Sequence, residues 1–401
     1  MDANEMKPQK LVEQLKRLPE ETILEILGKL PLRDLLVFRC VSKPWCIKLD
    51  NNPEFVHMTR NNFSLMLIDE TKILCSLDNN TLSSSLSNGI DGCVEEVHCP
   101  LVPLGWNLEV TSFVGTCNGL FCMYSEEDKE RFCLWNPCTN EIRFLPRAGF
   151  RRIEVNMRFA LVRGHGFGYD SKSDDYKYVR IFYPKNGSEV SEVHIYSFRA
   201  NTWKLRYVPY ELNNVVRDNR APNGVFYNGA LHWIARRIGF GSYYPKVLLA
   251  FDMTEENVRE IPQPENVVVT EMGNTYVDVL DGCLCILYDS AGFQVWVMKD
   301  YGMRQSWTMR YNISKPTVFE FRSVVDLRKI ECLKTGEILL EFHSWEYETS
   351  TAALILYDPK NESLTVLKDL KEFQLANLRS VFHRYVKSLV KLNSEPYIGE
   401  G

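Results

Sequence analysis

The sequence predicts an α+β, multidomain protein with a short block of three helices followed by a large all-β domain. Leucine and isoleucine recur at helical spacing in the first 50 or so residues. After His57, apolar and polar residues alternate in short runs separated by turn residues, as in strands. The chain has 401 residues, which is enough for a small module and one large core.

Composition and charge exclude several classes of protein. Hydrophobic residues make up 45% of the chain and charged residues 25%, as in ordinary folded proteins. The formal net charge of -5 gives no electrostatic reason to expect a nucleic acid or an acidic membrane as partner. No apolar run approaches the roughly 20 residues of a membrane helix. The first residues lack the apolar segment of a secretory signal, so we expect a cytoplasmic and/or nuclear protein.

The first predicted helix begins at Pro19, a residue suited to the first helical position. Ile23, Leu27 and Leu30 then follow at i, i+4 and i+7, which gives one apolar stripe. Pro31 ends this helix and can start the next, because proline is tolerated in a first turn and not in a helix interior.

The second predicted helix has apolar residues at Leu32, Leu35 and Leu36, and Ser42 can cap a third that carries Trp45. About 40 residues are close to the lower limit for a domain that folds alone. The block has more apolar surface than it can cover. Two alternatives follow from the pattern: the block binds a partner protein, or it packs on the large domain.

The stretch LPEETILEILGKLPLRDLLVFRCVSKPWCIKLDNNPEF resembles an F-box from end to end. The resemblance implies docking on a Skp-family adaptor and, through it, on a cullin–RING ubiquitin ligase. The positions that correspond to the adaptor-binding residues of that family are Leu18, Pro19, Ile23, Leu27, Leu30, Pro31, Leu32, Leu35, Leu36, Val41 and Trp45.

The β-rich part contains a recurring unit of strand, polar turn and strand. Its copies are RFCLWNPCTNEIRFLP, VHIYSFRANTWKLRYVP, LLAFDMTEENVREIPQP, FQVWVMKDYGMRQSWTMRY and LILYDPKNESLTVL. They recur about every 45 to 60 residues, close to the period of a propeller blade with loop insertions. We therefore predict a β-propeller of six or seven irregular blades, with a β-sandwich as the alternative. The predicted parts are a tail at 1–14, the helical module at 15–58, the β domain at 59–392 and a tail at 393–401.

The β units also resemble the F-box-associated domain of plant F-box proteins, which is kelch-like. The resemblance rests on LWNPCTNEIRFLP, GHGFGYDSKSDDYKYVRI, NGALHWIA, AFDMTEENVREIP and VWVMKDYGMRQSW, in family order. The chain contains no Gly-Gly pair and so departs from a standard kelch array. The segment from Arg384 to Leu392 alternates with one more apolar face and resembles the closing stretch of that family, so we predict a strand, with an amphipathic helix as the alternative. Because a ring of blades needs its ends joined, we expect this strand to pair near Phe63 to Leu77.

No motif for catalysis or for a cofactor stands out. The twelve cysteines lie mostly in apolar runs, which predicts reduced, buried thiols. A zinc site at Cys117, Cys122, Cys133 and Cys138 is a weak alternative, since no CxxC knuckle occurs. The GHGFGYD stretch lacks a following helix, so it predicts a turn feeding a strand and not a phosphate loop. His232 has no second ligand at i+2 or i+4, which favours a structural histidine.

Two stretches suit a target-binding loop. The run IRFLPRAGFRRIEVNMRFALVRG clusters arginines, including Arg151 and Arg152, and suits an acidic protein surface. The run RRIGFGSYYPK offers Arg236, Arg237, Tyr243 and Tyr244, residue types that often anchor interfaces. The alternative is that the charged loop is only solvated and that the aromatic residues near strands belong to the core, which are the commoner arrangements.

The two parts together predict a non-catalytic substrate receptor of a Skp–cullin–F-box ubiquitin ligase, which captures an unidentified target protein. Two alternatives stay open: an F-box protein that works outside ubiquitylation, and a propeller enzyme or lectin. The second alternative would need a converging metal or acid–base set, which the sequence does not offer.

Overall fold

A computed structural model of the chain describes Thr22 and most of the region from Phe63 to Leu392. The described residues from Phe63 on are 63–68, 74–78, 95–106, 111–125, 128, 131–146, 160–184, 189–212, 222–238, 246–265, 267, 274–289, 292–314, 324–346, 349–370, 382–388, 390 and 392. The chain divides into two compact units, Met1–Asn62 and Phe63–Gly401. Thr22 is helical, and the other residues of the first unit lie outside the described part.

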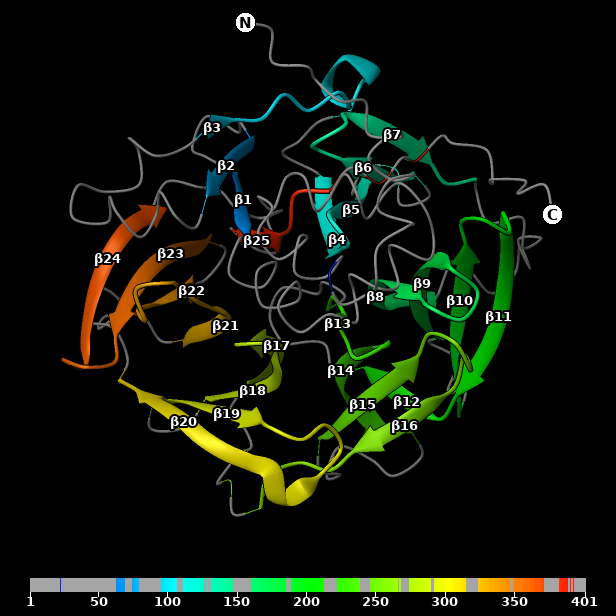
Figure 1. The fold of residues 1–401 in the computed structure, drawn as a ribbon. Coiled ribbons are helices and arrows are strands. Elements are labelled where there is room, and N and C mark those ends of the chain that lie inside the picture. The colour runs from blue at the N-terminus through cyan, green and yellow to red at the C-terminus, as the bar shows by residue number, and fades with distance from the viewer. Residues whose placement is uncertain are drawn as a thin grey trace, which may run out of the picture. The chain divides into compact units, whose positions relative to one another are not determined.

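The described strands form a β-propeller of six blades arranged around a common axis (Figure 1). Blade 1 joins the two ends of the domain and has the strand order β25-β1-β2-β3. Its strands are β1 (Ser64–Ile68), β2 (Leu74–Asp78), β3 (Glu95–Glu96) and β25 (Phe382–Tyr385). The six blades confirm the predicted propeller and fix its blade count, and the sandwich alternative is wrong.

The other five blades follow one another along the chain. Blade 2 contains β4 (Thr111–Cys117), β5 (Leu120–Ser125), β6 (Phe132–Asn136) and β7 (Glu141–Phe144), and blade 3 contains β8 (Ala160–Asp170), β9 (Asp175–Pro184), β10 (Ser191–Ser197) and β11 (Thr202–Val208). Blade 4 contains β12 (Tyr210–Leu212), β13 (Val225–Tyr227), β14 (Ala230–Arg237), β15 (Val247–Asp252) and β16 (Val258–Ile261). Blade 5 contains β17 (Thr275–Leu280), β18 (Cys283–Asp289), β19 (Phe293–Met298) and β20 (Trp307–Ile313), and blade 6 contains β21 (Val324–Cys332), β22 (Ile338–Glu346), β23 (Thr349–Asp358) and β24 (Ser363–Leu370).

Two short 3-10 helices, η2 (Val102–Leu104) and η5 (Arg304–Ser306), accompany the strands. No helix in the described part of the chain is long and apolar enough to cross a membrane.

The repeated sequence unit is the outer hairpin of a blade. Its turn begins with an Asx side chain: Asn136 Oδ1 accepts from the backbone N–H of Cys138 at 2.9 Å, and Asp252 and Asp358 do the same in blades 4 and 6. The turn ends in a left-handed residue, for example Glu362 at φ 50°. Such Asx turns nucleate a chain reversal without tertiary contacts, which is why the unit was visible in the sequence.

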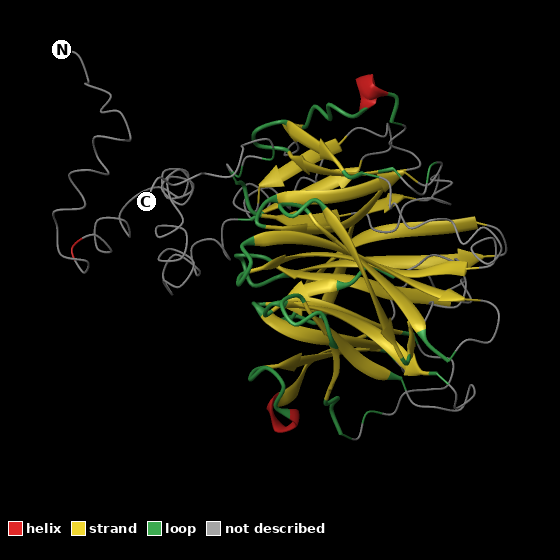
Figure 2. Cartoon of the chain, turned by 90° about the vertical axis from the view of Figure 1, so that its right-hand side faces the viewer, coloured by secondary structure: helices red, strands yellow, loops and turns green. Residues whose placement is uncertain are grey.

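The inner hairpins of three blades use Asn-Gly or Asp-Gly turns with positive φ at both positions. In blade 2, Asn118 has φ 51° and Gly119 has φ 79°. This backbone matches the right-handed twist of paired strands, and asparagine and glycine adopt it at little cost. These turns lie at one face of the ring, which we call the lower face. It is the left side of the propeller in Figure 2, where most of the described turns are drawn in green.

The core lies between neighbouring blades, because each blade packs its two faces against the blades beside it. Glycines in β8 illustrate how closely blades 3 and 4 approach. A Cβ atom at Gly166 would lie 2.6 Å from Leu231 Cδ1, and one at Gly168 would lie 2.4 Å from Phe226 Cδ2. The stretch GHGFGYD therefore lies inside a strand and is not the predicted turn; its glycines serve packing between blades.

The ring closes through β25, which is antiparallel to β1 with Ser64 opposite Tyr385 and Leu67 opposite Phe382. The predicted pairing partner is confirmed, but the predicted strand bounds are wrong. The strand spans 382–385, and the described residues after it follow the lower edge of blade 2 without strand pairing. Asn136 Nδ2 holds that segment by donating to the carbonyls of Ser388 at 3.1 Å and Val390 at 2.8 Å.

Candidate interaction sites

The adaptor-binding residues predicted from the F-box resemblance all lie outside the described residues, so they stay predictions. The same holds for four of the six predicted target-binding residues, Arg151, Arg152, Tyr243 and Tyr244. Arg236 and Arg237 are described and form the end of β14.

Arg237 binds within blade 4. Its Nε lies 2.7 Å from Glu260 Oε1, and its other terminal nitrogen donates to Oε2 at 2.8 Å. The Tyr210 hydroxyl donates to the same carboxylate at 3.0 Å. The hydrogen bond from Arg237 is the main reason why the pKa of Glu260 is lowered. A forked arginine–carboxylate pair fixes the guanidinium, so the contact of Arg237 seen in the structure is one within blade 4.

Arg236 lies beside a second basic side chain that the sequence prediction missed. Burial, and next the charge of Arg236, lower the pKa of Lys246 to about 8. Arg163, at β8, lies 3.6 Å from Glu211, which is opposite Arg236 in the β12–β14 pair. These basic residues lie where blades 3 and 4 meet, and their proximity depends on pairing between strands and on packing between blades.

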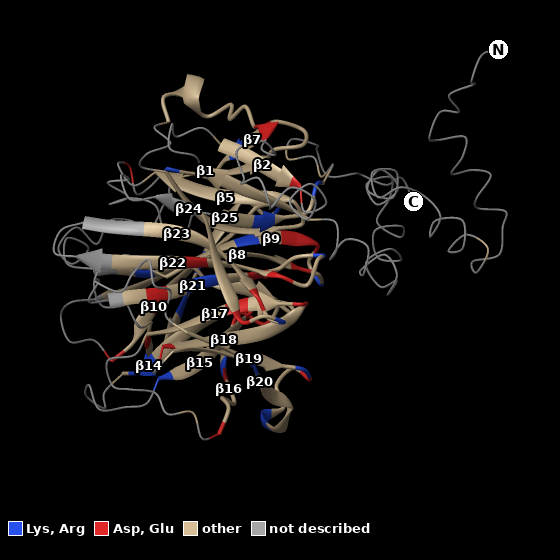
Figure 3. Ribbon diagram, turned by 90° about the vertical axis from the view of Figure 1, so that its left-hand side faces the viewer, with Lys and Arg blue, Asp and Glu red and all other residues tan. Residues whose placement is uncertain are grey.

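Both predicted target loops attach at the same face of the ring. The chain leaves β7 at Phe144 and returns at Ala160, and it leaves β14 at Arg237 and returns at Val247. All four positions are at strand ends away from the tight turns of the lower face; we call this side the upper face. Figure 3 shows basic and acidic residues mixed among the blades on one side of the ring.

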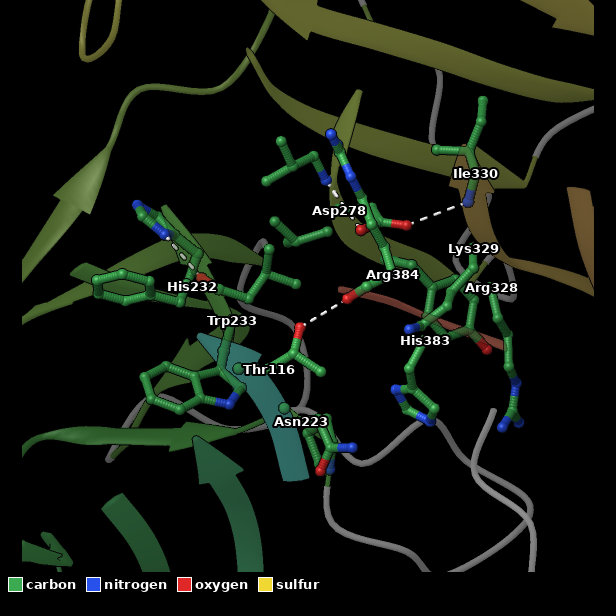
Figure 4. A pocket seen from close by; sticks show the side chains of 18 of the residues that line it. Thr116, Asn223, His232, Trp233, Asp278, Arg328, Lys329, Ile330, His383 and Arg384 are labelled. Carbon is green, nitrogen blue, oxygen red and sulfur yellow. Dashed lines mark hydrogen bonds between the residues drawn. The ribbon is translucent and has the colours of Figure 1, made fainter. Parts of the chain in front are cut away.

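A cavity of about 380 Å³ lies at the centre of the ring. Its lining comes from the innermost strands of the blades and from β14 (Figure 4). One side of the lining is apolar and aromatic, with Val114, Phe167, Phe226 and Trp233 from blades 2 to 4. The other side is charged, and its residues come from blades 5, 6 and 1.

The charged wall carries three cationic side chains, Arg328 and Lys329 of β21 and Arg384 of β25. The guanidinium of Arg384 lies 3.4 Å from Glu331 Oε1. Burial is the main cause that raises the pKa of Glu331 to about 8, and the charge of Arg384 opposes that shift. The Lys329 ammonium donates to the Phe382 carbonyl at 3.0 Å.

Asp278 is the second carboxylate of the charged wall, and its oxygens bind the backbone. Oδ1 accepts from the N–H of Val279 at 2.9 Å, and Oδ2 accepts from the N–H of Ile330 at 3.1 Å. Burial raises the pKa of Asp278, and Lys329 opposes that shift. The charged wall thus holds three cationic side chains against two carboxyl groups, and the oxygens of Asp278 are engaged by the backbone.

His232 has a structural environment, as its sequence context predicted. Its Nδ1 lies 3.1 Å from the carbonyl of Val225 and its Nε2 lies 2.7 Å from the Tyr301 hydroxyl. Burial is the main cause that lowers its pKa to about 4, so the ring is neutral at pH 7.

The cysteines of the weak zinc alternative do not converge. Cys117 and Cys122 pack in the core between blades 2 and 3, whereas Cys133 packs on the other face of blade 2. Among the described residues, no group of three or more His, Cys, Asp or Glu side chains could hold a metal ion.

Comparisons with known proteins agree with this architecture. Residues 56–392 match the family model of the F-box associated beta propeller domain, and residues 15–57 match that of the F-box domain. The chain belongs to the F-box-associated β-propeller family. It is an F-box protein with a propeller domain, as the two sequence resemblances implied.

Relatives in this family align with most of the chain. The F-box protein CPR1 of Arabidopsis thaliana is 28% identical over 88% of this chain and 84% of its own length. The F-box protein At4g22390 of Arabidopsis thaliana is 28% identical over 86% of this chain and 85% of its own. Among solved structures, an oligogalacturonate lyase in complex with manganese is 10% identical, with a TM-score of 0.34 over 65% of this chain and 66% of its own; this likeness is too weak to bear on function.

The cavity residues of this family member were not found from the sequence. Arg328 and Lys329 lie in β21, and Arg384 lies in β25. Only the arrangement of blades around the axis brings them together, and no local signal marks them.

Proposed function

We propose that this F-box protein is the substrate-recognition subunit of a Skp–cullin–F-box ubiquitin ligase. Residues 15–58 dock on a Skp-family adaptor, and the propeller captures a target protein for ubiquitination. The chain itself is not an enzyme; it supplies proximity between the target and the conjugating machinery. Its location is the cytoplasm and/or the nucleus.

The observation that carries this proposal is the order of the two matched domains along one chain. An F-box match at 15–57 is followed by a propeller match at 56–392. The apolar residues of the first segment exceed what about 40 residues can cover, which suits a module completed by a partner. A propeller is a rigid platform for variable loops, a common way to present recognition residues.

The adaptor half of the proposal is tested by co-purification of the full chain with a Skp-family adaptor. We expect Leu30→Ala combined with Pro31→Ala to lower the yield of adaptor at least tenfold, because truncating a buried leucine costs roughly 2–5 kcal/mol. Leu104→Ala is a matched control, since this exposed leucine of η2 lies in the propeller. Undiminished adaptor binding by the double variant, with the propeller still folded, contradicts the proposal.

The target half concerns the two loops at the upper face. Changing Arg151 and Arg152 to glutamate should weaken target capture and leave the melting temperature nearly unchanged. The control is the same charge reversal at Lys334 and Lys360, which are exposed in turns of the lower face. A large fall in melting temperature, or equal effects of the two double variants, would show that the arginine loop has no special role.

Ubiquitylation is tested by following the captured target in cells with and without a proteasome inhibitor. The proposal expects the inhibitor to raise the amount of target that co-purifies. An F-box protein that works outside ubiquitylation would bind the adaptor and show no such rise.

A further inference from the structure

We propose that the central cavity of the propeller binds a small organic anion with an apolar body, held by Arg328, Lys329 and Arg384 of the charged wall. This inference does not depend on the ubiquitin ligase role. It rests on the size of the cavity, the division of its lining and the orientation of its charged groups.

The size is that of a small-molecule site. The cavity measures about 380 Å³, within the roughly 300–1,000 Å³ of known ligand pockets. Arg328, Lys329 and Arg384 all line this cavity, and each is partly buried.

The division of the lining sets the chemical class. In Figure 4, Trp233 lies on one side of the cavity, and Arg328, Lys329 and Arg384 lie on the other. Phe167 and Phe226 extend the aromatic side. A ligand that fills this space gains most when an apolar body contacts the aromatic side and a charged group faces the cations. An organic anion with an apolar body makes both kinds of contact at once.

The orientation of the charged groups favours an anion over a cation. Both oxygens of Asp278 already accept backbone N–H groups, from Val279 and Ile330. Glu331 is 4% exposed, and its carboxyl group lies 3.4 Å from the guanidinium of Arg384. The Lys329 ammonium uses one of its three N–H groups on the Phe382 carbonyl. The remaining donors of this ammonium can reach a carboxylate or phosphate.

A bound anion would also join the ends of the ring. Arg384 belongs to the closing strand β25, whereas Lys329 belongs to blade 6. Thr116 of blade 2 donates to the carbonyl of Arg384 at 2.8 Å. A ligand that contacts β25 and blade 6 together stabilises the closed ring, because it binds the folded state and not the unfolded chain.

The test uses the full chain and the aromatic anion 4-benzoylbenzoate, whose ketone cross-links to nearby residues under light. The neutral amide of the same shape, 4-benzoylbenzamide, is the matched ligand control. We expect the anion to raise the melting temperature in a saturable way and to bind at least tenfold more tightly than the amide. Cross-links are expected in peptides that contain residues 275–279, 328–331 or 382–384.

Three variants test whether the positive charge of Arg328 contributes to binding of the anion. Arg328→Gln should weaken binding of the anion at least tenfold, and Arg328→Lys, which keeps the charge, should weaken it less. Lys334→Gln removes a positive charge from an exposed turn of the same blade and should bind like the wild type. If Arg328→Gln does not fold, the ligand pair and the cross-link positions on the wild type decide the question.

The inference is overturned by any of four results. These are equal affinity for the anion and the amide, undiminished binding by folded Arg328→Gln, cross-links confined to residues outside the cavity, and the absence of saturable binding.

Discussion

The hydroxyl of Tyr385 lies 2.9 Å from the hydroxyl of Ser76, a residue 309 positions earlier in the chain. Both residues belong to blade 1, where the last strand of the domain completes a sheet begun by the first. Burial raises the pKa of Tyr385 to about 12, so its hydroxyl keeps its proton and can donate across this contact. The contact ties the two ends of the propeller together.

The neighbouring blades hold the same strand by its backbone. Glu341 Oε2 of blade 6 accepts from the Phe382 N–H at 3.2 Å, and Thr116 of blade 2 donates to the Arg384 carbonyl at 2.8 Å. We expect a chain that ends at Phe382 to aggregate or to lose cooperative unfolding, because blade 1 then lacks its innermost strand. A chain that ends at Asn393 keeps β25 and should unfold like the full protein. Urea unfolding followed by circular dichroism, with light scattering for aggregation, makes the comparison. Cooperative unfolding of the shorter chain would refute closure by β25.

Lys177 is a buried cation that joins blades 3 and 4. Its ammonium lies 2.9 Å from Asp170 Oδ2 and 3.1 Å from Glu256 Oε1, and both carboxylate side chains are only 4% exposed. In Lys177→Met, Glu256 keeps its ion pairs with Lys204 and Arg206, but the buried Asp170 loses its cation. Removing one partner of a buried pair typically costs about 3–5 kcal/mol. Lys172→Met is the control, since its side chain is 76% exposed and lies 3.5 Å from Glu255. Its free energy of unfolding should change by less than about 0.5 kcal/mol. Equal values for the two variants in urea titrations would rule out a structural role for the buried cluster.

Glu331 should make the propeller less stable as pH rises. Its pKa is raised from 4.5 to about 8, chiefly by burial. The folded state therefore holds a proton that the unfolded chain releases, and the free energy of unfolding falls between about pH 4.5 and pH 8. Glu331→Gln cannot lose a proton, so its stability relative to the wild type should increase with pH across that window. Each unit of pKa shift corresponds to about 1.4 kcal/mol.

Unfolding of both proteins at pH 5, 7 and 9 gives the difference directly. Other titrating groups that do not contact Glu331, such as His232, occur in both proteins and largely cancel in that difference. A difference that stays constant with pH, or that shrinks as pH rises, would show that burial of Glu331 does not hold its proton.

Gly166 tests the close approach of blades 3 and 4. In Gly166→Ala the new Cβ would lie 2.6 Å from Leu231 Cδ1 and 2.9 Å from Trp233 Cζ2, so the buried side chains of Leu231 and Trp233 must shift. Overpacking of this kind costs about 1–3 kcal/mol. Gly115→Ala is the matched control in β4, because its Cβ would meet Phe167 Cβ at an ordinary 3.8 Å. A thermal melt in which the two variants behave alike would argue against tight packing at Gly166.

The sequence alone determined the turns of the hairpins in this protein. Turns such as the one that begins at Asn136 and the Asn118-Gly119 reversal depend on residues a few positions apart, so their chemistry is readable without a fold. The same local reasoning predicted GHGFGYD as a turn, although it lies in a strand. Its glycines make room for Leu231 and Phe226 of the neighbouring blade.

The blade count, the bounds of the closing strand and the charged wall of the cavity depend instead on the folded ring. Lys329 meets Phe382, and Arg384 meets Glu331, because the ring brings blades 6 and 1 side by side. The target-binding role of Arg237 stays a prediction, but its contact with Glu260 depends on the pairing of β14, β15 and β16. These contacts depend on how sheets stack around an axis. A pattern within one strand records the burial of that strand but not the identity of the distant side chains that bury it.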